Sequence, residues 1–165
     1  MKSRSPDSFN TLIAVLEREI QRLDVVVDRN RQAADRLGAA EPTWMEYVVL
    51  AHTLHNAYSL MEGYFLRIAK FFENEIGNDS WHKDLVQRMT VEIESVRPAL
   101  LTAEVAQRID ELRGFRHLYR NLYDTDLKPD RIIPLQAQFP DTIDQFQEAH
   151  RRFIAALRLL VRGVR

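Results

Sequence analysis

The sequence contains no cysteine in its 165 residues. This absence excludes disulfide bonds, a catalytic thiolate and zinc sites built on cysteine, and it favours a reducing, cytoplasmic compartment. Long apolar runs are also missing. Nothing approaches the roughly 18 uninterrupted apolar residues that identify a membrane-spanning helix, and Asn10, Glu17 and Arg18 interrupt the apolar character of the N-terminal segment. The sequence therefore predicts neither a signal peptide nor a membrane segment.

Helix-breaking residues are scarce, with five glycines and six prolines in the chain. Between these breaks the apolar residues keep the spacing of helices rather than the alternation of strands. The sequence therefore predicts an all-α protein. Its length favours one domain over residues 1–165, long enough to bury a sizeable core. Because the net charge is −1, any contact with nucleic acid needs a local basic patch.

The breaks divide the chain into an up-and-down bundle of four to five helices plus a short helix. The first helix is predicted from Pro6 or Ser8 to Leu37, and the second from the Pro42–Thr43 boundary to Ile76. A third helix, capped by Asp79 or Ser80, is predicted to run through Ile93 and to end at Pro98 or just before it. Thr102 caps a fourth helix that reaches Leu127. Residues 130–138 are predicted as a short irregular helix around Pro134, and Pro140 opens the last long helix.

The predicted second helix carries several aromatic residues and two histidines. Tyr58, Tyr64 and Phe65 fit a central core helix better than a cofactor site. His52 and His55 share a face with Glu62, but Glu62 lies two turns beyond His55. This spacing is too long for one metal ion without ligands from another helix. We predict no metal site and no cofactor.

The stretch from Glu111 to Asp124 divides into two faces on a helix of about 100° per residue. Leu112, Phe115, Leu118, Tyr119 and Leu122 lie on one side. The other side gathers Arg113, Arg116, His117, Arg120, Asn121 and Asp124, with Tyr123 at its edge. This polar face fits a solvated charged surface, and it equally fits an anion-binding surface with an imidazole able to move protons.

The segment from Arg116 to Tyr123 resembles the signature of HepT-type HEPN proteins, which are small all-α RNase toxins that act as homodimers. The family pattern is Arg-Asn-x-x-x-His-x-Tyr, and Arg116 and Tyr123 match its ends. Further segments resemble a HepT-like subgroup; they begin at His55, Trp81 and Asp110. The likeness covers about residues 45 to 160.

The resemblance implies metal-independent RNA cleavage, in which the ribose 2′-OH attacks the adjacent phosphate. It implies catalytic roles for Arg116, His117, Arg120 and Asn121, with Arg113 binding a flanking phosphate. An imidazole suits proton transfer, and guanidiniums suit an anionic phosphorane. The resemblance also implies a nucleotidyltransferase antitoxin as partner, which attaches AMP to the motif tyrosine, here Tyr123.

The polar residues inside the motif are exchanged, because His117 stands at the usual Asn position and Asn121 at the usual His position. This exchange moves the imidazole by roughly 6 Å along the helix axis. Three interpretations follow. The chain is an RNase toxin, a non-catalytic subunit that docks a nucleotidyltransferase, or a helical interaction protein whose arginines are simply solvated.

Overall fold

The structure is a computed structural model that describes residues 5–39, 43–73, 81–120 and 127–163. Five α-helices follow one another: α1 (Pro6–Ala39), α2 (Trp44–Phe72), α3 (Trp81–Arg88), α4 (Ala103–Arg120) and α5 (Pro129–Gly163). The described residues form no β-strand, although an isolated bridge pairs Ile93 with Arg97. The prediction of an all-α bundle is confirmed.

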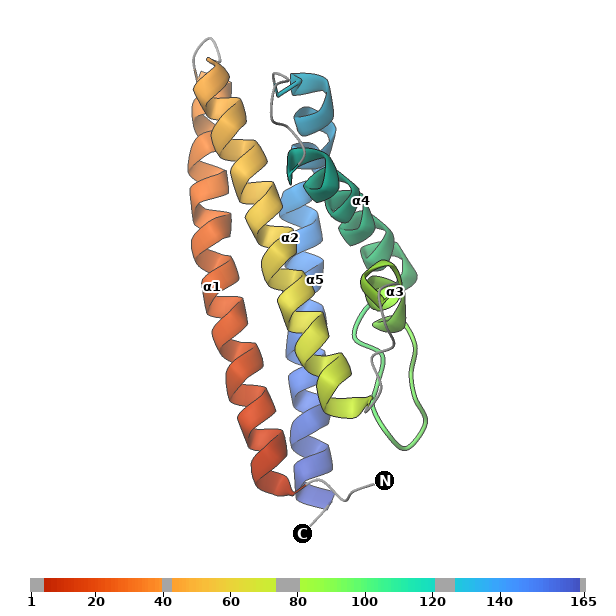
Figure 1. Cartoon of the computed structure of the whole chain (residues 1–165). Helices are drawn as coiled ribbons and strands as arrows, with labels where there is room; N and C mark the ends of the chain where they lie inside the picture. The colour runs from red at the N-terminus through yellow and green to blue at the C-terminus, as the bar shows by residue number, and fades with distance from the viewer. Residues whose placement is uncertain (1–4, 40–42, 74–80, 121–126, 164–165) are drawn as a thin grey trace.

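The helices α1, α2 and α5 are long rods that run side by side along the molecule (Figure 1). α1 packs on α2 and α5, and α4 packs on the same two helices from the other side. α4 crosses α2 obliquely and runs in the opposite direction, while the short α3 packs against α2 and α4. The polar stretch of α4 is therefore brought against α2.

The start of α2 agrees with the predicted boundary at Pro42 and Thr43, but its end differs from the prediction. Thr43 caps the helix and forms a capping box with Glu46. The helix ends at Phe72, before the predicted Ile76, because Glu73 adopts an extended backbone with φ −113° and ψ 110°. The Glu73 carboxylate accepts hydrogen bonds from Arg88 and Arg97, which ties this residue to the following segment. Residues 74–80, including the predicted caps Asp79 and Ser80, lie outside the described residues.

The third helix is shorter than predicted, because α3 ends at Arg88 and not near Pro98. After it, the backbone N–H groups of Leu100 and Leu101 donate to the Met89 carbonyl, at 2.9 and 3.0 Å. The β-branched run that includes Thr90, Val91 and Ile93 has low helix propensity. The segment after Arg88 therefore forms turns that fold back over α3.

The last helix is continuous, and the predicted break between residues 138 and 140 is wrong. Pro134 and Pro140 both lie inside α5. A proline inside a helix removes one backbone hydrogen bond. Here the apolar stripe continues across both prolines, and its members are buried against α1, α2 and α4: Ile132, Phe139, Ile143 and Phe146. Tertiary packing of this stripe maintains the helix.

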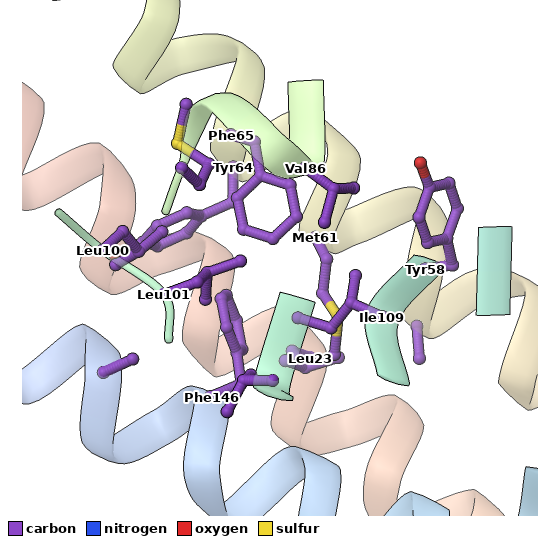
Figure 2. Packing of buried hydrophobic residues seen from close by; sticks show 14 of the residues in the cluster. Leu23, Tyr58, Met61, Tyr64, Phe65, Val86, Leu100, Leu101, Ile109 and Phe146 are labelled. Atoms are coloured by element: carbon purple, nitrogen blue, oxygen red, sulfur yellow. The ribbon is translucent and has the colours of Figure 1, made fainter. Parts of the chain in front are cut away.

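One apolar core joins all five helices. Figure 2 shows its centre, where Leu23 of α1, Val86 of α3 and Phe146 of α5 surround the side chains of α2. Tyr58, Tyr64 and Phe65 are buried as predicted. Trp44 departs from its predicted place in the apolar band, since it is 73% exposed in the first turn of α2. In the described part of the chain, none of the helices combines the length and apolar character needed to span a bilayer.

Candidate functional site

The fold fixes the position of α4 through a buried stripe. Thr102 accepts a hydrogen bond from the Val105 N–H, as predicted for its cap. Val105, Ile109, Leu112 and Phe115 are buried. In the last three turns, Arg113, Arg116, His117 and Arg120 share an arc of about 100°, beside the arc of Leu112 and Phe115. Arg116 lies two turns beyond the buried Ile109, so it projects on the same side of the helix. Asn121 and Tyr123 lie outside the described residues.

Arg116 is the α4 cation most closely engaged with α2. Its Nη2 lies 3.2 Å from Oε2 of Glu62, and the two side chains are 24% and 13% exposed. The guanidinium carbon also lies 5.7 Å from the centre of the Tyr58 ring, within cation–π range. Its Nε is buried without a hydrogen-bond partner among the described residues. Arg116 is therefore a positioned, half-buried cation and not part of a solvated face.

Tyr58 is a buried residue whose ring faces the guanidinium of Arg116. Its side chain lies at the edge of the apolar cluster, and its hydroxyl points away from Met61 and Ile109 (Figure 2). The hydroxyl has no hydrogen-bond partner in the described part of the structure. Burial, together with the negative charge of Glu62, raises the pKa of Tyr58 well above its ordinary value. The phenol therefore stays neutral and keeps a proton that can be donated.

Arg113 and Arg120 differ in their surroundings. Arg113 makes a two-pronged pair with Asp110, in which Nε and Nη2 donate to the carboxylate at 2.6 and 3.2 Å. This hydrogen bonding raises the pKa of Arg113, and the carboxylate offsets its charge toward other anions. Arg120 and His117 are exposed near the end of α4.

The predicted apolar side of the motif helix is partly wrong. Leu112 and Phe115 are buried, but Leu118 is 42% exposed. Leu118 lies about 120° around the helix from Leu112, outside the arc that faces α2 and α5. Tyr119 is half-buried and packs against the apolar core beside Phe115, as predicted, and it also contacts histidine side chains of α2. Leu122 lies outside the described residues.

The imidazole rings of His52 and His55, both on α2, contact the ring of Tyr119 on α4. The ring of His55 lies against the Tyr119 ring, with centroids 4.8 Å apart and planes inclined by 32°. The Asn56 amide donates to Nε2 of His52 at 2.9 Å, which leaves Nδ1 of His52 to donate to the Tyr119 hydroxyl, 3.4 Å away. Burial lowers the pKa of His55, and the charges of Arg116, His52 and Arg120 lower it further.

These residues form one constellation, which we call the α2/α4 cluster: His52, His55, Tyr58, Glu62, Arg113, Arg116, Tyr119 and Arg120. It gathers three guanidiniums of α4 and two imidazoles of α2 around Tyr58, Glu62 and Tyr119. Among the described residues, no three His, Cys, Asp or Glu side chains are grouped so that they could hold a metal ion. The imidazoles of the cluster are able to transfer protons, and its guanidiniums are able to stabilise negative charge.

A comparison with protein-family models matches residues 49–157, more than half of the chain, to the model described as HepT-like protein. The chain belongs to the HepT-like family. This assignment agrees with the helical HEPN fold, and the match runs from α2 to α5, so that it contains the whole α2/α4 cluster. Searches among curated proteins and among solved structures found no match.

In this HepT-like chain, the structure brings together Arg113, Arg116 and Arg120 from the predicted site and adds residues of α2 to them. Sequence reasoning missed the association of Glu62, Tyr58 and His55 with the α4 arginines. Their spacing of three and four residues, with His55, Tyr58 and Glu62 on one side of α2, was the available signal. This spacing shows that the three side chains share one side of α2, but their contact with α4 depends on how the two helices cross.

Proposed function

We propose that this HepT-like chain is a toxin-type, metal-independent endoribonuclease of a toxin–antitoxin pair. The observation that carries the proposal is Arg116, a half-buried guanidinium held by Glu62 and stacked on Tyr58. A cation fixed before substrate binds stabilises developing negative charge without reorganising, which makes it effective toward a phosphorane. Family membership supports the same chemistry.

The proposed reaction begins when the ribose 2′-OH attacks the adjacent phosphorus. Arg116 and Arg120 stabilise the phosphorane, and His117 takes part in proton transfer. Asn121 orients a phosphate oxygen. Arg113 binds a flanking phosphate, although its positive charge is partly offset by the paired Asp110. The products are a 2′,3′-cyclic phosphate and a free 5′-hydroxyl.

The proposal includes two partners. A homodimer doubles the arginine array and lines a cleft for single-stranded RNA. A nucleotidyltransferase antitoxin attaches AMP to Tyr123, seven residues after Arg116 in the motif. The added phosphate is an anion that competes with RNA for the same guanidiniums. The modified chain is therefore inactive.

The experiment induces the wild-type chain alone in cells and compares it with Arg116→Ala and His117→Ala. We expect growth arrest and fragmented RNA with the wild type, and intact RNA with both variants. Arg151→Ala is the matched control, because Arg151 is an exposed arginine of α5 that pairs with Glu148 three residues away. RNA that stays intact with a soluble, well-expressed wild-type chain contradicts the proposal.

A second candidate is a non-catalytic subunit that docks a nucleotidyltransferase. Two observations favour it, namely the exchanged His117 and Asn121 and the pairing of Arg113 with Asp110. Co-purification with the nucleotidyltransferase distinguishes this candidate when His117→Ala leaves both binding and RNA unchanged. If Arg120→Ala also changes nothing, the remaining interpretation is a helical interaction protein with a solvated arginine face.

A further inference from the structure

The end of α1 and the start of α2 form a groove that the proposed reaction does not use. The two helices lie side by side at one end of the molecule (Figure 1). The groove between them has a volume of about 380 Å³, within the range of about 300–1,000 Å³ that is typical of small-molecule sites. Its lining includes Met45, Val48 and Val49 of α2 and Arg29, Gln32 and Arg36 of α1. The groove therefore combines an apolar surface with positive charge.

The apolar side chains of this groove are open to solvent and do not belong to the core. Met45 and Val49 are four residues apart, so they share one side of α2, and they are 59% and 42% exposed. On α1, Arg29 and Arg36 lie two turns apart on one side and are both exposed. A ligand in the groove therefore contacts apolar surface from one helix and guanidiniums from the other.

The charge of the groove favours an anion. Glu46 is the one carboxylate among the lining residues, and it accepts hydrogen bonds from the N–H and the hydroxyl of Thr43 in the cap of α2. Arg29 and Arg36 bring two guanidiniums, so the lining is positively charged although the whole chain is not. The amide of Gln32 both donates and accepts hydrogen bonds, as the edge of a nucleobase requires.

Trp44 extends the apolar surface toward the start of α2. It lies in the first turn of the helix and is 73% exposed. Because it precedes Val48 by four residues, it lies on the same side of α2 as this lining residue. An indole ring offers a flat face on which any base stacks, and aromatic side chains beside cations are typical of single-stranded nucleic-acid sites.

His52 joins the groove to the α2/α4 cluster. Its side chain lines the groove, and its Nδ1 lies 3.4 Å from the hydroxyl of Tyr119 on α4. In the proposed function, Arg116 and Arg120 of the same helix bind the phosphate at the cleaved bond. An RNA strand held by these arginines can therefore continue over His52 into the groove.

We infer that the groove between α1 and α2 is a subsite for a nucleotide of single-stranded RNA that flanks the cleaved bond. The base lies on Met45 and Val49 beside Trp44, and Arg29 and Arg36 pair with phosphates. The inference rests on the proposed function, in which RNA is the substrate, and deepens it by assigning a path to the strand beyond the α2/α4 cluster.

The first test measures the binding of a fluorescent single-stranded RNA to the purified full chain. The RNA carries 2′-O-methyl groups, which remove the attacking hydroxyl, so that binding is measured without cleavage. We expect Trp44→Ala and Met45→Glu to raise Kd by about 10-fold or more. Leu159→Glu is the matched control for the added charge, because Leu159 is 66% exposed on α5. Equal Kd values for Met45→Glu and Leu159→Glu contradict the inference.

The dependence of binding on salt tests the arginines. For single-stranded nucleic acid, each phosphate contact contributes about −0.7 to the slope of log K against log salt concentration. We expect Arg36→Gln to make this slope shallower by about 0.7. Arg31→Gln removes the same charge from an exposed arginine of α1 that pairs with Asp28 outside the groove, so its slope should equal that of the wild type. An unchanged slope for Arg36→Gln contradicts the assigned phosphate contact.

A protein is the other kind of occupant that an exposed apolar surface fits. Photo-crosslinking of RNA that carries 5-iodouridine locates the strand directly, and we expect crosslinks to Trp44 or Met45. Analytical ultracentrifugation of the wild type and Met45→Glu shows whether a second copy of the chain covers the groove. Crosslinks confined to other segments overturn the inference. It is also overturned if Met45→Glu converts a dimer to a monomer that binds RNA as tightly as the wild type.

The failure of this inference differs from the failure of the proposed function. If the groove variants bind and cut RNA as the wild type does while Arg116→Ala is inactive, the subsite is wrong and the RNase proposal stands. If the wild type binds RNA through the groove but leaves a cleavable RNA intact, the subsite stands and the RNase proposal is wrong. If the wild type neither binds nor cuts RNA, both are wrong. Circular dichroism and thermal melting of each variant separate lost binding from lost folding.

Discussion

Glu62 holds Arg116 across the contact between α2 and α4, with 3.2 Å between Oε2 and Nη2. The pair joins the central helix of the bundle to the helix that carries the family motif. Glu62 is the less exposed partner, so its carboxylate is a partly buried anion that faces the guanidinium. The relationship makes Glu62 a positioning residue for Arg116.

We expect Glu62→Gln to lower the kcat/KM of RNA cleavage by about 10- to 100-fold, because a displacement of about 1 Å at a catalytic group has an effect of this size. The amide keeps the shape of the side chain but removes the charge that orients the guanidinium. Glu148→Gln is the control, since Glu148 pairs with Arg151 at the surface of α5. Equal rates for Glu62→Gln and the wild type would show that Arg116 is oriented without this carboxylate.

The buried pair of His150 and Tyr64 predicts a dependence of stability on pH. Nδ1 of His150 lies 2.9 Å from the Tyr64 hydroxyl, and burial lowers the pKa of His150 below its ordinary value of 6.5. Below that value the unfolded chain binds a proton more readily than the folded chain, so the free energy of unfolding falls as the pH falls. The contribution of His150 to the free energy of unfolding is therefore largest above pH 6.5, where its ring is neutral in both the folded and the unfolded chain.

Urea unfolding at a series of pH values from about 7.5 down to 5 measures this slope. We expect a shallower slope for His150→Gln than for the wild type, whatever the absolute stability of the variant. His55 adds to the wild-type slope in the same direction, because its pKa is also lowered by burial. Identical slopes for the wild type and His150→Gln would contradict the prediction.

Arg97 anchors the segment between α3 and α4. Its side chain is 1% exposed, pairs with Glu73 at 3.0 Å, and donates to the carbonyls of Arg88 and Val91. We expect Arg97→Ala to reduce the free energy of unfolding by about 3–5 kcal/mol, since it removes one partner of a buried ion pair. Arg151→Ala, at an exposed pair, should cost at most about 1 kcal/mol. Similar urea midpoints for the two variants would rule out the anchoring role.

A polar contact within the bundle joins α1, α2 and α5. The Asn30 amide donates to Thr53 at 2.9 Å and to Gln136 at 2.8 Å, and Gln136 donates back at 2.8 Å. We expect Asn30→Leu to cost about 1–3 kcal/mol, because it leaves buried partners unsatisfied. Adding Gln136→Leu should recover part of the loss, which a double-mutant cycle measures as coupling. Strictly additive losses would show that the residues act independently.

Much of the fold follows from the sequence by itself. The helical spacing of apolar residues, the Thr43 and Thr102 caps and the scarcity of breaks specify the starts of α2 and α4 and the helical class. These signals are local, since they depend on residues within one or two turns of each other. The same is true of the motif arginines, whose common face on α4 requires only the helical period.

The tertiary structure decided the features that depend on distant residues. Packing of the stripe that contains Phe139 and Phe146 keeps α5 continuous through Pro140, against the local preference for a break. The contacts of Arg88 and Arg97 with Glu73 are associated with the early end of α2.

The candidate site also combines features that follow from the sequence with features that depend on the tertiary structure. The sequence by itself determined that Arg113, Arg116 and Arg120 lie together on one helix. Only the crossing of α2 and α4 decided that Arg116 meets Glu62 and Tyr58, and that His55 stands in the field of two arginines. The physical reason is that helical periodicity fixes directions around one axis, whereas the surroundings of a charge depend on every helix packed against it.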